Sequence, residues 1–359
     1  MADLPDCATS REIASQPRIW REWAEPLSSE AASIRRWIAE NDIRRVWFSG
    51  AGTSAFIGET VAAGARDGLD LRAVPTTDIV AAPADHLGAT DLLVVQFGRS
   101  GDSSESIGTL DLLDRCFADA FQLAVTCNPG GTLARRQPAG PGEGRVLLLP
   151  EDTHDRGFAM TSSYTTMLLS ALACFDGSVD AAERLPRLAD AAETVLARLV
   201  ATAPKRPERA IFLGSGALKG VARESALKVL ELTAGRTMTQ WDSTLGFRHG
   251  PKAAVAEGTR VCVMIHPDEH TARYDRDVAA EIARQFPTAH VETIGGRGCD
   301  LELPLTGDAR WDAVLYVLAA QVRAVQWSAE LGLPVDDPFA GQGNLSRVVS
   351  GVTLYPFAG

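Results

Sequence analysis

Short apolar runs alternate with longer amphipathic segments along most of the chain, beginning near residue 45. The first run, 46–49, is followed by the glycine-rich turn 50–54 and by a helical segment over 55–65. Further extended runs fall at 71–75, 92–97, 122–126 and 146–149, and a helical pattern over 161–175 closes the series. Strands that alternate with helices at this spacing predict a parallel sheet with helices on both faces.

The same series starts again at residue 210. Residues 47–52 (WFSGAG) match residues 211–216 (IFLGSG) position by position, and the later runs at 261–265, 291–294 and 301–305 repeat the earlier order. We therefore predict an α/β protein with two tandem domains, each a five-stranded parallel sheet in a three-layer α/β/α sandwich. The expected division is a helical arm over 1–44, a domain over 45–176, a helical linker over 177–207, and a second domain with a C-terminal tail over 208–359.

Composition narrows the classes of function. The formal net charge of −11 argues against a nucleic-acid-binding surface. The six cysteines are scattered without a CxxC pair, as is typical of reduced thiols, so we expect a cytoplasmic protein. The sequence shows no apolar run of membrane-spanning length and no signal pattern at its start. We accordingly expect no membrane or nucleic-acid partner.

Two glycine-serine loops of the first repeat each lie between a predicted strand and a predicted helix. They are residues 50–54 (GAGTS) and 98–106 (GRSGDSSES). Backbone N–H groups and hydroxyls at a helix N-terminus stabilise an anion, and Arg99 adds a charge that suits a phosphate. The first loop lacks the third glycine of a GxGxxG motif, so we do not expect a dinucleotide. The alternative interpretation is that the serines only cap a helix.

Residues 210–254 contain the candidate acid–base groups. A helix predicted over 219–233 places Glu224, Lys228 and Glu231 on one face, and a turn over 246–251 carries His249. Such a triplet can be an exposed ion pair worth a few tenths of a kcal/mol. The glycine loop before the helix and the histidine turn after it favour an active site instead. The adjoining face, expected to seat the helix on the sheet, consists of Leu227, Leu230 and Ala234.

These motifs together resemble the tandem sugar isomerase (SIS) family. The doubled unit, the GAGTS loop, the SGDSSES loop and ESALKVLEL…GFRHGP carry the resemblance, which covers residues 45–359. The segments FGRSGDSSES, FAMTSSYTTM, DSTLGFRHGPK and RVVSGV are most similar to the AgaS-type group of galactosamine-6-phosphate deaminase/isomerases (tagatose-6-phosphate ketose/aldose isomerases). The isomerase half of glucosamine-6-phosphate synthase is a further relative by resemblance.

The resemblance implies a role for each matching residue. Glu231 matches the glutamate that moves a proton between C1 and C2, and Lys228 and Glu224 line the same site. His249 matches the histidine assigned to ring opening, which in the family often comes from a neighbouring subunit. Arg347 stands where the synthase has a lysine near the substrate. The positions implied to hold the sugar phosphate are Thr53, Ser54, Arg99, Ser100, Ser103, Thr161 and Ser162.

The activity that the resemblance implies is conversion of a hexosamine 6-phosphate, of galactosamine or glucosamine type, to a ketose 6-phosphate and ammonia. Proton transfer between two carbons needs a positioned carboxylate, so we expect no metal and no cofactor. A fructosamine-phosphate deglycase, an aminosugar synthase without its own glutaminase, and a non-catalytic sugar-phosphate sensor are the alternatives. The expected assembly is a homodimer or homotetramer with sites shared between subunits.

Overall fold

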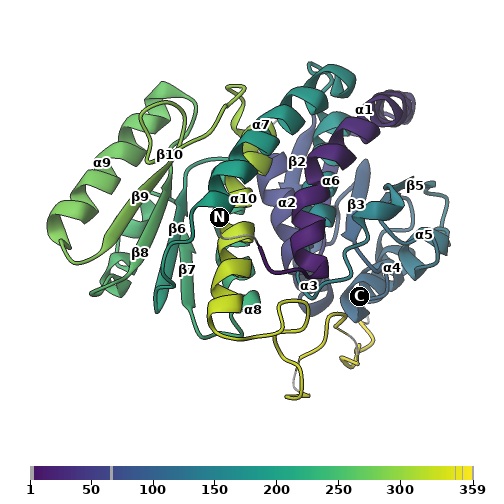
Figure 1. Ribbon diagram of the computed structural model, residues 1–359. Helices are drawn as coiled ribbons and strands as arrows, with labels where there is room; N and C mark the ends of the chain where they lie inside the picture. The colour runs from purple at the N-terminus through teal and green to yellow at the C-terminus, as the bar shows by residue number, and fades with distance from the viewer. Residues whose placement is uncertain (1–3, 65–67, 344, 350, 358–359) are drawn as a thin grey trace. The chain divides into compact units, whose positions relative to one another are not determined.

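The computed structural model describes residues 4–64, 68–343, 345–349 and 351–357 and contains two five-stranded sheets (Figure 1). The chain forms two compact units around these sheets. Of the described residues, the β1–β5 unit comprises 22–64, 68–155, 162–184, 345–349 and 351–357, and the β6–β10 unit comprises 4–21, 156–161 and 185–343. The C-terminal segment therefore packs with the β1–β5 unit, although it follows the β6–β10 unit in sequence.

The first sheet has the strand order β2-β1-β3-β4-β5, and all of its pairs are parallel. Its strands are β1 (Arg45–Ser49), β2 (Asp70–Ala73), β3 (Leu92–Gly98), β4 (Phe121–Thr126) and β5 (Gly144–Leu148). The helices that precede, connect or follow them are α1 (Ala8–Glu40), α2 (Thr53–Ala62), α3 (Thr76–Ala81), α4 (Ser104–Cys116), α5 (Thr132–Arg135) and α6 (Ser162–Phe175). Two 3₁₀ turns belong to the same unit, η1 (Pro83–His86) and η2 (Glu151–Thr153), whereas residues 8–21 of α1 are assigned to the β6–β10 unit.

Successive residues of a strand point to opposite faces of the sheet. The strands therefore place apolar side chains on both faces, and helices cover each face. On one face Trp47 and Val94 pack in a buried cluster with Phe117, which follows α4. On the other face the Phe48 ring lies 4.9 Å from the Phe175 ring at the end of α6. All seven residues of β3, the central strand, are buried, which explains why its sequence is apolar except for Gln96.

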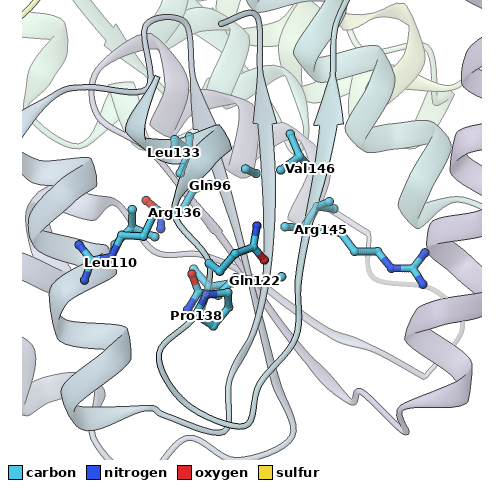
Figure 2. A pocket seen from close by; sticks show the side chains of 13 residues that line it. Gln96, Leu110, Gln122, Leu133, Arg136, Pro138, Arg145 and Val146 are labelled. Carbon is cyan, nitrogen blue, oxygen red and sulfur yellow. The ribbon is translucent and has the colours of Figure 1, made fainter. Parts of the chain in front are cut away.

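A small cavity lies within the β1–β5 unit, between the strands β3 to β5 and the helices α4 and α5 (Figure 2). Leu110 and Leu133 line it, together with the amides of Gln96 and Gln122. Its volume of about 20 Å³ admits one water molecule and no metabolite. This cavity is therefore not a substrate site.

The second sheet has the strand order β10-β9-β8-β6-β7 and is also parallel throughout. Its strands are β6 (Arg209–Gly214), β7 (Met238–Asp242), β8 (Arg260–Met264), β9 (His290–Gly295) and β10 (Leu301–Glu302). Its helices are α7 (Ala181–Ala201), α8 (Leu218–Leu232), α9 (Glu269–Gln285) and α10 (Ala309–Glu330), with 3₁₀ turns η3 (Gly246–Arg248) and η4 (Pro251–Ala254). None of the described helices combines the length and the apolar character needed to cross a lipid bilayer.

Figure 1 shows α9 on one face of the second sheet and the pair α8 and α10 on the other. Val278 and Ile282 of α9 join Ile211 and Val261 of the central strands in one buried cluster. On the opposite face the hydroxyl of Tyr316, on α10, donates to the carbonyl of Ile265 over 2.6 Å. Helix α10 is buried along nearly its whole length, so α8 packs between two apolar partners, the sheet and α10.

The two sheets repeat one topology, which confirms the predicted duplication. Read from β2 and from β7, the two orders are the same, with β1 matching β6 and β3 matching β8. A Cβ atom on Gly50 would lie 2.6 Å from the Cβ of Ser54, and one on Gly214 would lie 2.4 Å from the carbonyl oxygen of Leu218. In both repeats, glycine therefore lets the helix start directly against the strand end.

The sequence pattern missed strand β7. Its residues are exposed or half-buried, because β7 is the edge strand of its sheet. Its sequence, MTQWD, contains no apolar run, so it gives no clear signal of a strand.

Candidate active site

The glycine-serine loops of the first repeat lie at the point where the sheet order reverses. Strands β1 and β3 are neighbours, but the chain leaves β1 toward β2 and leaves β3 toward β4. Connections that leave in opposite directions open a crevice at the carboxyl ends of such strands, and ligands of parallel sheets bind there. Loop 50–54 follows β1 and loop 98–106 follows β3, so the fold brings both predicted phosphate loops to one place.

The first loop turns sharply into helix α2. Gly52 has a φ of 55°, a conformation that L-residues with side chains seldom adopt. Thr53 and Ser54 form the first turn of α2, and each is 5% exposed. Both hydroxyl residues thus lie at a helix N-terminus, where the helix dipole favours an anion.

The second loop is fixed by its own hydrogen bonds. The Ser103 hydroxyl accepts from the backbone N–H of Ser106 over 3.3 Å and caps α4. The carbonyl of Ser100 accepts from Asn128 Nδ2 over 2.8 Å, and the Asp102 carboxylate accepts from Thr132. The capping interpretation therefore holds for Ser103. It does not exclude ligand binding, because a serine hydroxyl can both donate and accept.

Two arginines and a histidine gather beside these loops. Arg99 is 7% exposed, and its Nη2 donates to the carbonyl of Arg347 over 3.1 Å. Burial, followed by the positive charges of Arg347 and Arg99, lowers the pKa of His154 below its usual 6.5. The C-terminal segment thus brings Arg347 to the predicted phosphate loops. Two cations beside a neutral imidazole form an environment suited to a dianion.

Asp155 organises the start of helix α6. Its carboxylate accepts from the backbone and the hydroxyl of Ser162, over 3.1 and 2.6 Å, and likewise from Ser163. Ser162 is fully buried and donates its hydroxyl hydrogen inside the protein. Thr161 is also fully buried, and its carbonyl accepts from Gln321 within the β6–β10 unit. A phosphate-binding role for these two residues stays a prediction.

Helix α8 buries two of the three ionisable residues that the sequence placed on one face. Glu224 is 0% exposed and Lys228 is 1% exposed. The Lys228 ammonium lies 2.6 Å from Glu231 Oε2 and 3.4 Å from Glu224 Oε1. The Glu231 side chain is 25% exposed. The interpretation as an exposed ion pair is therefore wrong, because a buried ammonium requires close carboxylates to offset its desolvation.

The apolar face of α8 also differs from the expectation. Leu227, Leu230 and Ala234 are only half-buried. The residues that pack against the sheet and α10 are small or branched, and they include Val221, Ala222, Ala226 and Val229. Small side chains let the neighbouring elements approach closely, which places the charged triplet in a buried environment.

His249 lies in an anchored but exposed turn after β7. The residues on either side of it bind one carboxylate of α9: Arg248 Nε lies 3.0 Å from Glu281 Oε2, and the Lys252 ammonium contacts Oε1. Lys252 and Arg248 hold the pKa of Glu281 below its usual range. His249 itself is exposed, and within the described residues no hydrogen bond or ion pair joins its side chain to α8. The turn therefore presents the imidazole outward.

Sequence reasoning missed His154 and Asp155. The signal was present, because both polar residues follow shortly after β5, at the carboxyl-end edge of the same sheet. Residues at this edge are candidates for ligand contacts in any parallel α/β fold.

In the second repeat, the loop that follows β6 is hydrogen-bonded to the carboxylate of Asp275. The Ser215 hydroxyl donates to Asp275 Oδ1 over 2.6 Å, and the backbone N–H of His266 donates to Oδ2 over 3.0 Å. Asp275 is fully buried, so its carboxylate takes the donors that an anionic ligand would need. The loops of the first repeat lie beside the arginines Arg99 and Arg347 instead.

Two sheets of one topology, with glycine-serine loops at the switch point of the first sheet, define a tandem SIS protein. No family model matches the chain. D-galactosamine-6-phosphate deaminase AgaS of Escherichia coli is 36% identical over 97% of this chain and 96% of its own length. An AgaS protein of Streptomyces coelicolor is 43% identical over 97% of this chain and 95% of its own length.

A solved structure agrees with these relatives. Tagatose-6-phosphate ketose/aldose isomerase from Escherichia coli has a TM-score of 0.89 at 34% identity, covering 99% of this chain and 98% of its own. Glucosamine-6-phosphate deaminase from Thermotoga maritima, at 23% identity and a TM-score of 0.75, shares the fold, covering 96% of this chain and 100% of its own. The chain belongs to the AgaS family of tandem SIS proteins, as its motifs indicated.

The buried pair Glu224 and Lys228 predicts that removal of the Lys228 charge will strongly destabilise the fold. Lys228→Met should lower the free energy of unfolding by about 3–5 kcal/mol, because it leaves buried carboxylate without its cation. Urea unfolding measures this loss. Lys219→Met, at an exposed position of the same helix, should change it by no more than about 0.5 kcal/mol. The double variant Glu224→Gln/Lys228→Met should regain part of the lost free energy of unfolding. Equal losses in Lys228→Met and Lys219→Met would contradict the buried pairing.

His154 predicts an acid-sensitive contribution to stability. Its pKa is depressed in the folded state, so below about pH 6.5 the unfolded chain binds a proton that the folded chain does not. Stability should therefore fall as the pH drops from 6.5 toward the folded-state pKa, and His154→Gln should weaken this fall. Urea midpoints across this range measure it, with His290→Gln at an exposed position as the control. Identical pH profiles for His154→Gln and the parent would refute the assignment.

Proposed function

We propose that this protein converts a hexosamine 6-phosphate, preferably of galactosamine configuration, into a ketose 6-phosphate and ammonia. The E. coli and Shewanella relatives, 36% and 37% identical, bear the name D-galactosamine-6-phosphate deaminase. The observation that carries the proposal is the carboxylate of Glu231, partly exposed beside the buried ammonium of Lys228. Glucosamine 6-phosphate is the second candidate substrate, favoured only by the shared fold of the Thermotoga enzyme.

The chemistry requires one well-held carboxylate. Glu231 would remove the proton from C2 of the open-chain amino aldehyde and return it to C1, while one proton passes from the nitrogen to O1, which leaves an imine at C2 and a hydroxyl at C1. Water then adds to C2, and the nitrogen leaves as ammonia, so a ketone remains. Lys228 holds Glu231 Oε2 at 2.6 Å and thereby fixes the carboxylate, while its exposed part stays open to substrate.

The phosphate would be held by the loops of the first repeat. We assign its contacts to Thr53, Ser54, Ser100 and Ser103, with charge from Arg99 and Arg347. This assignment is supported by the switch-point position of the loops, by the burial of Arg99 and by the contact between Arg99 and the Arg347 carbonyl. A fixed phosphate would orient the sugar and lower the entropic cost of the proton transfer.

We further propose a homodimer or homotetramer in which His249 serves the site of a neighbouring subunit. The support is that His249 is exposed in a turn anchored on α9 rather than on α8. We place the enzyme in the cytoplasm, since the described thiols are all free and a reducing compartment keeps them so.

The first experiment measures ammonia and ketose 6-phosphate from a panel of hexosamine 6-phosphates. Galactosamine 6-phosphate should give both products in equal amounts, and the glucosamine epimer should react more slowly. Aldose–ketose exchange without ammonia would indicate a plain isomerase, and aminosugar formation with added ammonia would indicate the synthase. Fructosamine 6-phosphate as the preferred substrate would indicate the deglycase. Tight binding without turnover of any substrate would indicate the sensor.

Glu231→Gln tests the assigned base. The variant should lose turnover by about 10²–10⁴-fold, the usual contribution of a positioned acid–base group, and should keep its affinity for the substrate. Steady-state kinetics and calorimetry separate the two effects. Glu257→Gln, at an exposed position away from α8, is the matched control and should retain full activity. Normal turnover by Glu231→Gln would show that another group is the base.

Mixing two inactive variants tests the shared site. Glu231→Gln and His249→Ala should each be inactive, and subunit exchange between them should restore part of the activity. Recovery is expected because a mixed assembly contains some sites with both parental residues. Mixing after denaturation and joint refolding, followed by the ammonia assay, measures it. If oligomers that are shown to contain both variants recover no activity, Glu231 and His249 act within one subunit.

A further inference from the structure

A second hollow, apart from the proposed active site, lies in the β6–β10 unit. It has a volume of about 840 Å³, which is in the range of pockets that bind small molecules. The end of α7, the strands β8 to β10 and helix α10 line it. Neither the charged residues of α8 nor His249 contributes to its lining. The strand order places it at the β10 edge of the sheet, whereas α8 connects β6 to β7 at the other edge.

Two arginines share one carboxylate at the floor of this hollow. Arg323 Nη2 lies 2.5 Å from Glu292 Oε1, and Arg260 Nη1 lies 3.3 Å from Glu292 Oε2. Arg323 is 5% exposed, and the side chains of Arg260 and Glu292 are 17% and 16% exposed. Two cations against one anion leave a positive charge in a setting where water screens it weakly.

The same arginines also have more donors than acceptors. A guanidinium carries five N–H donors, and Arg323 uses its Nη1 only toward the thiol of Cys262, over 3.8 Å. The Nε atoms of Arg260 and Arg323 are buried without a hydrogen-bond partner among the described residues. A buried guanidinium with few acceptors is stabilised by an anion whose several oxygen atoms accept its remaining hydrogen bonds.

The rim of the hollow differs from its floor. Arg198, Asp300 and Glu302 are exposed, and the Arg198 guanidinium donates to the backbone carbonyl of Glu302 over 3.1 Å. Exposed charges are screened by water and salt, so they offset the floor charge only weakly. Leu199 and Leu301 form an apolar part of the wall of the hollow. The hollow therefore offers a buried cationic floor, apolar sides and a polar mouth.

We propose that this hollow binds a small organic oxyanion, a carboxylate or phosphate ester, through Arg260 and Arg323. Its anionic group lies against the two guanidiniums, and its carbon skeleton contacts the leucines. Glu292 is the internal counter-ion, which keeps both arginines in place when no ligand is bound. This inference is independent of the proposed deaminase activity, because none of the residues assigned to that activity lines the hollow.

Protection of Cys299 from alkylation tests the proposal. Cys299 is half-buried and lines the hollow, whereas Cys116 is half-buried on α4 and serves as the internal control. The full-length protein is treated with iodoacetamide, a neutral reagent, and mass spectrometry follows each thiol. Citrate and inorganic phosphate are the probes, each at millimolar concentration, with sodium chloride at matched ionic strength as the blank.

The expected result is slower alkylation of Cys299 by about tenfold with at least one probe, and an unchanged rate at Cys116. Protection by citrate alone identifies a carboxylate ligand, and protection by phosphate alone identifies a phosphoryl ligand. Anion binding at the proposed active site would not change the Cys299 rate, so the two sites are distinguished. The absence of protection with both probes overturns the proposal.

Three variants test whether the protection of Cys299 depends on the charges of Arg260 and Glu292. Arg260→Gln should remove it, Arg260→Lys should keep part of it, and Glu292→Gln should strengthen it severalfold by releasing both guanidiniums. Arg273→Gln, at an exposed position on α9, is the matched control and should behave as the parent. Glu292→Gln keeps the test valid if Arg260→Gln fails to fold. Protection that persists in Arg260→Gln, or that weakens in Glu292→Gln, overturns the proposal.

Discussion

The buried ammonium of Lys228 is the constraint on which the proposed catalytic helix depends. A cation that is 1% exposed costs several kcal/mol to desolvate, so the fold must keep carboxylates next to it. Glu224 and Glu231, one turn away on either side, supply them at 3.4 and 2.6 Å. This pairing fixes the rotation of α8 between the sheet and α10, and it fixes the carboxylate of Glu231 at the edge of the buried region. Stability and the proposed chemistry therefore rest on the same three side chains.

Duplication explains the architecture, and charge explains how the two copies diverged. Both repeats need a glycine where the first strand meets its helix, because any side chain there would collide with that helix. Packing thus keeps the two copies alike at Gly50 and Gly214. The loops beyond these glycines are free of that constraint. In the second copy Asp275 takes the available donors, whereas in the first copy Arg99 and Arg347 add positive charge near the donors. Among the described residues, the switch-point loops of the first copy are therefore the candidate anion site.

Much of the fold follows from local pattern in the sequence, and the misses have physical causes. Short apolar runs marked the buried strands β1, β3, β6 and β8, because a strand with helices on both faces is apolar along most of its length. The edge strand β7 gave no such signal, since one side of it faces solvent. The candidate loops, Lys228, Glu231 and His249 were all selected from spacing and neighbouring glycines. His154 and Asp155 were not, because their relation to Arg99 arises only when β5 lies in the same sheet as β3.

The sequence by itself determined the doubled α/β pattern, the glycine turns and the placing of Glu224, Lys228 and Glu231 on one helical face, because each depends on residues close together in the chain. Whether that face meets water or protein depended on what packs against α8, and the tertiary structure decided it in favour of burial. The same holds for Arg347, which is distant in sequence from Arg99 but contacts it in space, and for the paired arginines on β8 and α10. Periodicity fixes which residues share a side of one element. Only the packing of elements decides which charges meet, because desolvation and pairing are properties of the assembled interior.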